Sequence, residues 1–286
     1  MKIALGTVQF GLDYGLANTA GRVAENTAQD ILRFALEAGV HTLDTAAAYG
    51  ASEEVLGRIG VDAFNVVSKV PPSTEGAEKP ASWIKRCIDQ SLSNLRCDSL
   101  YGLLMHRPLD LLKPNGGEFY EALVNIKRQG LAERIGISVY GPDELDKLVD
   151  FDFDLVQAPM NILDRRLKNS GWLDKLSKQG TEVHIRSAFL QGLLLMPAEQ
   201  RPEYFKPWRK LLSEYDSWLA VQQLSPLQVC LGFLNGHSEI DKVVIGVDKP
   251  EQLREIVSAA SAPITQIPES IQTLDLNLIN PGLWRL

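Results

Sequence analysis

The sequence has few cysteines and no long hydrophobic run, and both absences limit the classes of protein it can encode. Its three cysteines, Cys87, Cys97 and Cys230, cannot build a disulfide framework and include no Cys-x-x-Cys pair. We therefore expect reduced thiols and a cytoplasmic protein. No run of about 18 apolar residues occurs, so the sequence predicts no membrane-spanning helix. The first six residues lack an extended apolar core, and we expect no secretory signal.

Basic residues are also in the minority. The 286 residues include 29 lysines and arginines against 36 aspartates and glutamates, which gives a net charge of −7. A protein that binds a nucleic-acid duplex usually carries a basic excess, so we expect no nucleic-acid partner. Hydrophobic residues make up 45% and charged residues 23% of the chain. This composition is typical of a globular protein and not of a disordered chain or a collagen-like fibre.

Several nucleotide- and metal-binding motifs are missing as well. No Gly-x-Gly-x-x-Gly follows a predicted strand and no Walker loop is present, which disfavours a Rossmann fold and a P-loop protein. The four histidines, His41, His106, His184 and His237, show neither His-x-His nor His-Glu-x-x-His spacing. A hydrolytic metal site needs several ligands that converge on one ion, so we expect no metal.

The sequence does contain a regular alternation of short apolar runs and longer amphipathic segments. The apolar runs, bounded by turn residues, predict buried parallel strands at 3–7, 42–45, 65–69, 99–106, 134–138, 155–158, 182–187 and 242–246. The amphipathic segments predict helices at 27–38, 52–58, 80–95, 117–129, 142–149, 173–178, 226–234 and 250–258. Gly39, Gly130 and Gly180 follow predicted helices, where glycine suits a left-handed C-terminal cap.

Eight strand–helix units in strict alternation predict right-handed crossovers and a parallel sheet. The count favours one domain, residues 1–286, that closes into a (β/α)8 TIM barrel; an open doubly wound sheet is the alternative. Two stretches exceed a minimal barrel: an extended loop after the seventh strand, 191–223, where we expect an extra helix, and a C-terminal tail, 262–286. Their aromatic residues either pack on the scaffold or wall a pocket, and the sequence leaves both open: Tyr204, Phe205, Trp208, Tyr215, Trp218 and Trp284.

The ends of three consecutive predicted strands carry ionisable residues. The second, third and fourth strands end in Asp44, Lys69 and His106, and Tyr49 lies one short loop past Asp44. In a (β/α)8 barrel the active site lies at the C-terminal ends of the strands. Each residue alone could be structural, as a cap, a snorkelling lysine or a packed ring. Together on adjacent strands they indicate a catalytic group.

These four side chains suit proton donation to a carbonyl oxygen. An isolated phenol is a weak acid near neutral pH. A lysine ammonium about 4 Å away stabilises the phenolate by about 4 kcal/mol at an effective dielectric of about 20, which makes Tyr49 a better acid. Asp44 would keep Lys69 charged against burial, and His106 would hydrogen-bond the substrate oxygen and orient it.

The segment from Asp44 to Gly50, Asp-Thr-Ala-Ala-Ala-Tyr-Gly, resembles a motif of the aldo-keto reductase superfamily. Lys69 and His106 follow it in the order found in that family. The resemblance begins in the N-terminal strand, Ala-Leu-Gly-Thr at 4–7, and extends to Val-Ile-Gly at 244–246 and the helix after it. It implies a (β/α)8 barrel and an oxidoreductase that transfers hydride from a nicotinamide cofactor, usually NADPH, to an aldehyde or ketone. Tyr49 then matches the general acid and the other three its supporting group.

The resemblance also implies a cofactor site along the barrel rim. Ser138 matches a serine that binds the nicotinamide carboxamide, whereas Val139 stands where an asparagine is usual. Arg186 takes the place of a tyrosine that stacks on the nicotinamide ring; a guanidinium can stack on a ring, and its charge would favour the reduced cofactor. The implied set is Gly6, Thr7, Asp44, Ser138, Gln157, Arg186, Ser187, Phe189, Gln191, Gly192, Gly246, Asp248, Lys249, Gln252 and Glu255.

Residues 246–249 resemble the loop that holds the adenosine 2′-phosphate of NADPH. Lys249 is the expected cation, and the start of the last helix suits an anion. Asp248 would repel a phosphate, and Gln252 stands where a basic residue is frequent. The resemblance therefore favours NADPH as the cofactor, with NADH as the alternative.

The substrate is expected to be a small-molecule carbonyl compound. Arg107 either binds a carboxylate or phosphate of that substrate or forms a surface ion pair. The predicted substrate pocket comprises Gln9, Phe10, Tyr14, Tyr49, His106 and Arg107. The identity of the substrate depends on loop shape, which the sequence does not indicate, and neither does it indicate an oligomeric state.

Two other functions fit the same barrel. The first is a non-catalytic sensor that binds a nicotinamide cofactor: the four candidate catalytic residues argue against it, while Val139 and Arg186 keep it open. The second is a Schiff-base aldolase with Lys69 as the nucleophile. That chemistry needs a neutral amine, which Asp44 opposes.

Overall fold

Eight parallel strands form a closed barrel in the computed structural model, which describes residues 2–73, 79–261 and 267–285. Each strand pairs with the next along the chain, and β8 pairs with β1. The predicted (β/α)8 barrel is therefore confirmed. The strands are β1 (Ile3–Gly6), β2 (Thr42–Asp44), β3 (Asn65–Val70), β4 (Leu100–Met105), β5 (Ala132–Ser138), β6 (Leu155–Pro159), β7 (Glu182–Arg186) and β8 (Lys242–Gly246).

Side chains inside the barrel are arranged in layers. Val67, Leu104 and Leu155 pack together there, and each is fully buried. Side chains two residues apart on a strand point to the same face, so the residues two positions further along, Lys69, His106 and Gln157, lie one layer above. The apolar layer thus forms a floor beneath the polar ends of the strands.

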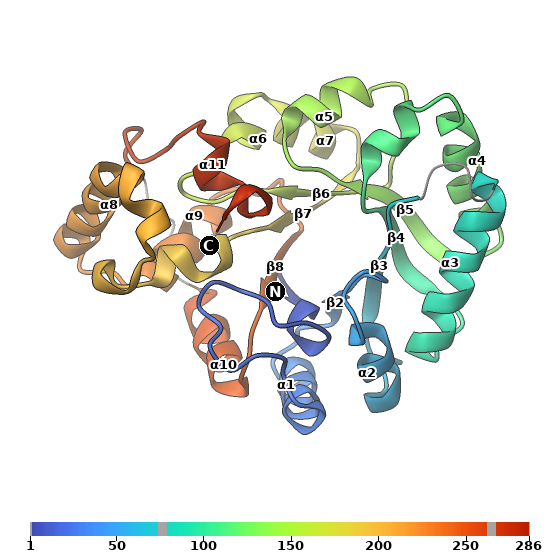
Figure 1. Cartoon of the computed structure of the whole chain (residues 1–286), viewed down its shortest axis with the longest axis horizontal. Coiled ribbons are helices and arrows are strands. Elements are labelled where there is room, and N and C mark those ends of the chain that lie inside the picture. Colours follow the sequence, from blue (N-terminus) through green and yellow to red (C-terminus); the bar gives the residue numbers. More distant parts are fainter. Residues whose placement is uncertain (1, 74–78, 262–266, 286) are drawn as a thin grey trace.

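A ring of helices surrounds the strands, as Figure 1 shows, in which α1 lies between α10 and α2, and α3 and α4 lie further along the ring. Gly39, Gly130 and Gly180 have φ of 76°, 72° and 75°, so the predicted left-handed caps are confirmed. The helices of the eight units are α1 (Glu25–Glu37), α2 (Ser52–Ile59), α3 (Pro80–Leu95), α4 (Gly116–Arg128), α5 (Pro142–Lys147), α7 (Trp172–Lys178), α9 (Pro226–Asn235) and α10 (Pro250–Ala259).

Three α-helices in the described part of the chain lie outside these units. The expected extra helix after β7 is α8 (Arg209–Gln222), which stands out from one side of the ring (Figure 1). The short helices α6 (Arg166–Asn169) and α11 (Leu276–Ile279) are absent from the predicted elements. Each has four residues, too few for a clear amphipathic period. Residues 262–266 and 286 of the predicted tail lie outside the described residues.

The tail is attached to the segment between β7 and α8 through aromatic contacts. The Phe205 ring lies 5.0 Å from that of Trp284 and 5.1 Å from that of Tyr204, in edge-to-face geometry. Trp208 Nε1 donates a 2.9 Å hydrogen bond to Asp275. Of the two roles left open for these aromatics, the structure supports packing on the scaffold.

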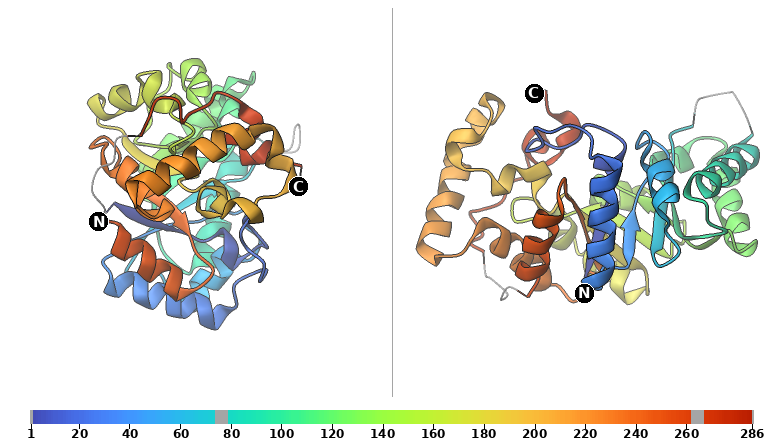
Figure 2. Two further views of the ribbon diagram at one scale, coloured as in Figure 1. Left: turned by 90° about the vertical axis from the view of Figure 1, so that its left-hand side faces the viewer. Right: turned by 90° about the horizontal axis from the view of Figure 1, so that it is seen from below.

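The two ends of the barrel differ. The loop after β1 and the C-terminal segment lie at one end, and the N-terminus lies at the other (Figure 2, right). No helix within the described ranges is long and apolar enough to cross a membrane. The three cysteines carry free thiols.

Candidate active site

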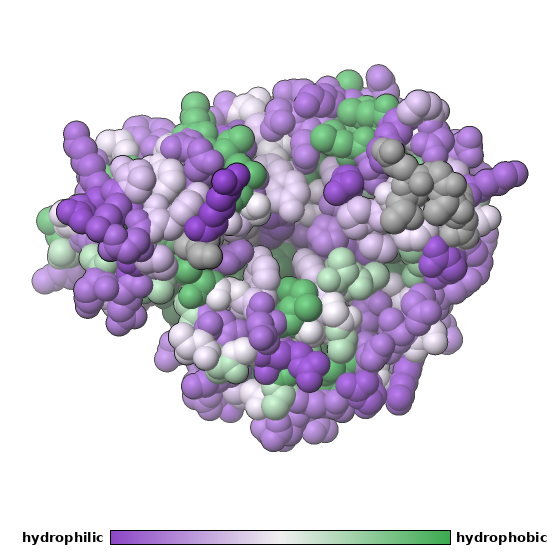
Figure 3. Space-filling view, viewed as in Figure 1, coloured by the Kyte–Doolittle hydropathy of each residue, from purple (hydrophilic) through white to green (hydrophobic). Residues whose placement is uncertain are grey.

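A cavity of about 590 Å³ opens at the C-terminal ends of the strands. The face seen in Figure 1 is hollowed near its centre in the space-filling view (Figure 3). Most of the predicted site residues line this cavity: Gly6, Thr7, Gln9, Tyr14, Asp44, Tyr49, His106, Ser138, Gln157, Arg186, Ser187, Phe189, Gln191, Gly192, Gly246, Asp248, Gln252 and Glu255.

Four predicted site residues are not among those that line the cavity: Lys69, which is buried beneath it, and Phe10, Arg107 and Lys249. Phe10 is the last residue of the 3₁₀ helix η1 (Val8–Phe10), and its side chain is fully buried in the hydrophobic core. Arg107 and Lys249 are both exposed. Each directly follows a residue that does line the cavity, His106 or Asp248.

Lys69 lies beneath the cavity and joins two predicted catalytic residues. Its ammonium is 2.8 Å from each carboxylate oxygen of Asp44, 2.9 Å from the Thr45 carbonyl oxygen and 3.5 Å from the Tyr49 hydroxyl. Lys69 is 1% exposed and Asp44 4%. Burial by itself lowers the pKa of Lys69, but the Asp44 carboxylate and the Tyr49 phenol outweigh it and raise that pKa above its usual value. The buried lysine therefore remains an ammonium.

Asp44 is held by a second donor from the opposite side of the barrel. Gln157 Nε2 donates a 2.6 Å hydrogen bond to Asp44 Oδ1, and Ser138 Oγ donates a 3.2 Å bond to Gln157 Oε1. Ser138 and Gln157 are paired across β5 and β6. This series of hydrogen bonds, from Ser138 through Gln157 and Asp44 to Lys69, holds the Asp44 carboxylate in one orientation.

Tyr49 and His106 face each other at the cavity. Their rings are 5.9 Å apart in edge-to-face geometry, and both line the cavity. Burial and the positive charge of Lys69 lower the pKa of His106 to about 4. His106 is therefore neutral at pH 7 and carries one ring N–H for donation. Its Nδ1 is buried and has no hydrogen-bond partner among the described residues.

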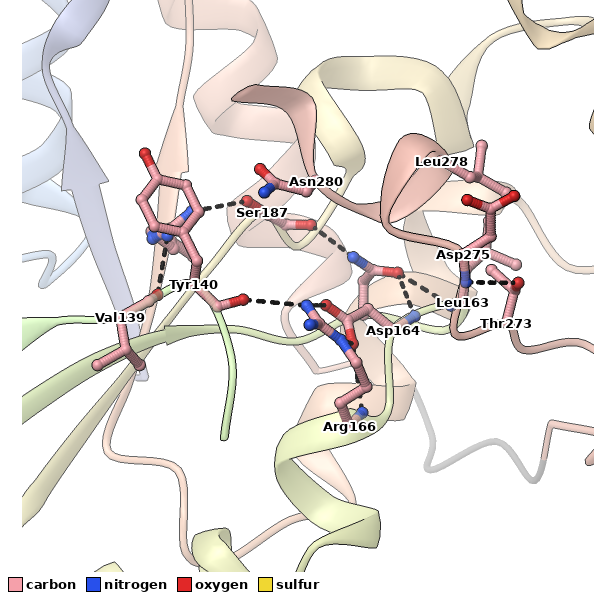
Figure 4. A network of polar contacts seen from close by, with 12 residues as sticks. Val139, Tyr140, Leu163, Asp164, Arg166, Ser187, Thr273, Asp275, Leu278 and Asn280 are labelled. Atoms are coloured by element: carbon pink, nitrogen blue, oxygen red, sulfur yellow. Dashed lines mark hydrogen bonds and ion pairs between the residues drawn. The ribbon is translucent and has the colours of Figure 1, made fainter. Parts of the chain in front are cut away.

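Arg186 ends β7 and lines the cavity. Its Nη2 donates a 2.9 Å hydrogen bond to the Val139 carbonyl oxygen, and Figure 4 shows Val139, Tyr140 and Arg166 in the surrounding polar network. The guanidinium also lies 4.7 Å from the centroid of the Tyr140 ring. Arg166 Nη2 in turn donates to the Tyr140 carbonyl oxygen at 3.0 Å. This network holds a cation on the cavity wall.

The loop after β1 meets the loop after β7 over the cavity. Gln191 Nε2 donates a 3.2 Å hydrogen bond to the Tyr14 hydroxyl, and the Ala17 N–H donates to the Gln191 carbonyl oxygen at 3.4 Å. Three non-glycine residues in this turn have positive φ: Ser187 at 60°, Leu190 at 46° and Gln191 at 53°. Such strained backbone is uncommon and clusters at functional sites.

The structure adds residues that the sequence did not single out. Tyr140 follows the predicted cofactor residues on β5, and the tail contributes Asn280, Pro281 and Gly282 to the lining. Tyr140 could have been found from its place two residues after Ser138. The tail residues carry no such signal, because only the fold brings them to the cavity.

Within 2–73, 79–261 and 267–285, no group of three or more His, Cys, Asp or Glu side chains is arranged to hold a metal ion.

The chain matches known proteins over nearly its whole length. The model of the aldo/keto reductase family matches residues 2–275. An uncharacterized oxidoreductase, YqkF, of Bacillus subtilis is 26% identical over 91% of each chain. An L-glyceraldehyde 3-phosphate reductase of Escherichia coli is 26% identical over 93% of this chain and 90% of its own. The fold is similar to that of the aldo-keto reductase AKR11C1 from Bacillus halodurans in its holo form, with a TM-score of 0.74 and 22% identity. The match covers 92% of this chain and 88% of that chain.

Proposed function

The chain belongs to the aldo/keto reductase family, and we propose that it reduces an aldehyde or ketone to an alcohol with hydride from a nicotinamide dinucleotide and a proton from Tyr49. The whole chain acts as one barrel domain in this proposal. Its oxidoreductase relatives support the reaction class. The three free cysteines suit a reducing compartment, the cytoplasm.

The observation that carries the proposal is the position of Lys69. A buried ammonium paired with Asp44 lies 3.5 Å from the Tyr49 hydroxyl. An ammonium at this distance stabilises the phenolate that forms when Tyr49 releases its proton. Without that charge, a phenol is too weak an acid to donate its proton readily to a carbonyl oxygen, a weak base, near neutral pH.

The residues of the cavity fit a nicotinamide dinucleotide. Ser138 and Gln157 present polar groups beside Asp44, where a carboxamide would bind. The Gln9 Oε1 atom is buried without a partner among the described residues, although Gln9 lines the cavity. A bound dinucleotide would supply a hydride to the carbonyl carbon. Gly6, Thr7, Ser187, Phe189, Gln191 and Gly192 are proposed to hold it along the rim.

The chain's own residues account for the remaining steps. Tyr49 donates its proton to the carbonyl oxygen as the carbon accepts hydride, so the C=O bond becomes CH–OH and Tyr49 becomes a phenolate. Lys69 stabilises that phenolate, and Asp44 keeps Lys69 charged. Neutral His106 donates a hydrogen bond to the same oxygen and directs it toward Tyr49. Solvent then returns a proton to Tyr49.

The same geometry argues against an aldolase. A Schiff-base lysine must be neutral to attack a carbonyl, and the pKa of Lys69 is raised by Asp44 and Tyr49 against the effect of burial. Lys69 also lies beneath Tyr49 and is 1% exposed.

The experiment that tests the proposal follows the loss of reduced-dinucleotide absorbance with a panel of aldehydes and ketones. We expect oxidation of the dinucleotide only when both enzyme and carbonyl compound are present. Binding of the dinucleotide is measured separately by titration. Tight binding with no carbonyl compound reduced would support the non-catalytic sensor instead.

A further inference from the structure

One end of the cavity is formed by β8 and the first turns of α10. Gly246, Val247, Asp248, Gln252, Glu255 and Ile256 line it there. In the closed barrel β8 lies across the mouth from β4 and β5. A dinucleotide whose nicotinamide lies beside His106 and Ser138 therefore extends its adenosine half toward α10. This placement rests on the proposed function.

The charged residues that line the cavity at this end are both acidic. Asp248 and Glu255 both line the cavity, and Asp248 Oδ1 has no hydrogen-bond partner in the described part of the chain. Lys249 is exposed and does not line the cavity, whereas the Arg254 guanidinium stacks 4.2 Å from the centroid of the Phe34 ring, on α1.

The positive charge of the cavity is elsewhere. Among the described lining residues Arg186 is the one lysine or arginine. It is held by Val139 and Tyr140 on the β5 side of the mouth. Lys249, at the start of α10, acts on Asp248 from outside the lining, and none of the described lining residues at the α10 end is a cation.

Two backbone N–H groups at the start of α10 are already hydrogen-bonded and are not free to bind an anion. Gln252 Oε1 accepts hydrogen bonds from the Asp248 N–H at 2.7 Å and the Lys249 N–H at 3.2 Å. The N-terminus of a helix binds phosphate through such unpaired N–H groups. Here the Gln252 side chain competes with a phosphate for these two N–H groups.

We propose that this end of the cavity selects NADH over NADPH, with Asp248 as the residue that discriminates between them. The ribose of NADH carries a 2′-hydroxyl, which can donate a hydrogen bond to the Asp248 carboxylate. NADPH carries at that position a phosphate with a charge of about −1.5 to −2, which meets two carboxylates and a capped helix start. An acidic residue that accepts from the 2′-hydroxyl is also how nucleotide-binding folds of other architecture favour the unphosphorylated cofactor. Lys249, which favours NADPH in the sequence, is outside the lining.

The first test compares the dissociation constants of NADH and NADPH for the unmodified protein, measured by calorimetric titration without substrate. We expect NADH to bind at least tenfold more tightly. Tighter or equal binding of NADPH would overturn the inference and leave the proposed function standing. Failure of both dinucleotides to bind would instead remove the proposed function.

The second test uses a matched pair of variants on the same helix start. Asp248→Asn removes a carboxylate from the cavity, and Glu251→Gln removes one from an exposed residue that does not line it. We expect Asp248→Asn to lower the Kd ratio of NADPH to NADH at least fivefold, and Glu251→Gln to change it less than twofold. Equal effects of the two variants would show that total charge, not Asp248, sets the preference. Thermal unfolding of each variant confirms that the binding data refer to folded protein.

Discussion

The Lys69 ammonium and the Tyr49 hydroxyl lie 3.5 Å apart at the base of the cavity. Lys69 reaches this position from β3 and Tyr49 from the loop after β2, and Asp44 fixes the lysine through both carboxylate oxygens. A phenol, an ammonium and a carboxylate thus form one line of contacts. Tyr49 and Asp44 both line the cavity, and in the proposed reaction a carbonyl oxygen is protonated at the phenol.

Substitution of Tyr49 by Phe should remove the proposed proton donor and leave the cavity intact. We expect kcat to fall by about 10²- to 10⁴-fold, the usual contribution of a general acid, with the dinucleotide Kd changed less than twofold. Tyr14→Phe is the control, because Tyr14 also lines the cavity but hydrogen-bonds to Gln191 and not to Lys69. Steady-state rates and titrations on both variants provide the comparison. Full activity of the Tyr49→Phe variant would show that another group donates the proton.

The Lys69–Asp44 pair should be coupled in stability as well as in catalysis. Lys69→Met leaves a buried carboxylate without its cation, and we expect the free energy of unfolding to fall by about 3–5 kcal/mol. Asp44→Asn added to Lys69→Met removes the unpaired buried carboxylate and should recover part of the lost free energy of unfolding. Urea denaturation of the two single variants and the double variant measures the coupling. Additive effects would show that the pair contributes no mutual stabilisation.

The lowered pKa of His106 predicts that the folded protein loses stability in mild acid. Its pKa is lowered to about 4 in the folded protein, against about 6.5 in an unfolded chain. Between these values the unfolded state binds more protons, so the stability contributed by His106 falls as the pH drops through this window. The full shift corresponds to at most about 3 kcal/mol, less what solvent screening removes at this partly exposed ring.

The measurement is the difference in unfolding free energy between the unmodified protein and His106→Gln at pH 7 and pH 4. We expect this difference to be smaller at pH 4, because glutamine does not titrate. The comparison matters because burial also lowers the pKa of His237, which contributes to both proteins alike. A difference that stays constant across the window would place His106 in a more solvated environment.

Arg186 should influence which redox form of the cofactor binds. A guanidinium on the cavity wall repels the positive ring of an oxidised nicotinamide more than the neutral reduced ring, so we expect the reduced form to bind more tightly. Arg186→Gln should reduce this preference about tenfold, as seen in titrations with both forms. Arg166→Gln is the control, since Arg166 belongs to the same network through Tyr140 but does not line the cavity. An unchanged preference in Arg186→Gln would place the ring away from the guanidinium.

The barrel and much of the site could be predicted because both depend on short-range patterns. Strand ends read from the apolar runs place Asp44, Lys69 and His106 on one rim, since consecutive parallel strands in a barrel are neighbours. The hydrogen bond from Gln157 to Asp44 joins residues 113 positions apart. No local pattern indicates such a contact, which depends on the closure of the barrel.

Most of the remaining differences between the predicted and the observed cavity lining are shifts by a single residue. Gln9 lines the cavity while the adjacent Phe10 is buried in the core, because the 3₁₀ turn points successive side chains in different directions. In the same way, Asp248 lines the cavity at the start of α10, whereas the adjacent Lys249 does not. Such choices depend on the exact rotation of a turn, which residue type alone does not specify.

The contact between the two loops over the cavity limits how the enzyme can be redesigned. Gly192 has φ of 95°, and a Cβ atom added to it would lie 2.7 Å from the Ala17 Cβ. A library that varies the turn after β7 therefore cannot treat the loop after β1 as a fixed background. Productive changes of substrate range should arise as paired substitutions, one from each loop, and seldom from either loop alone.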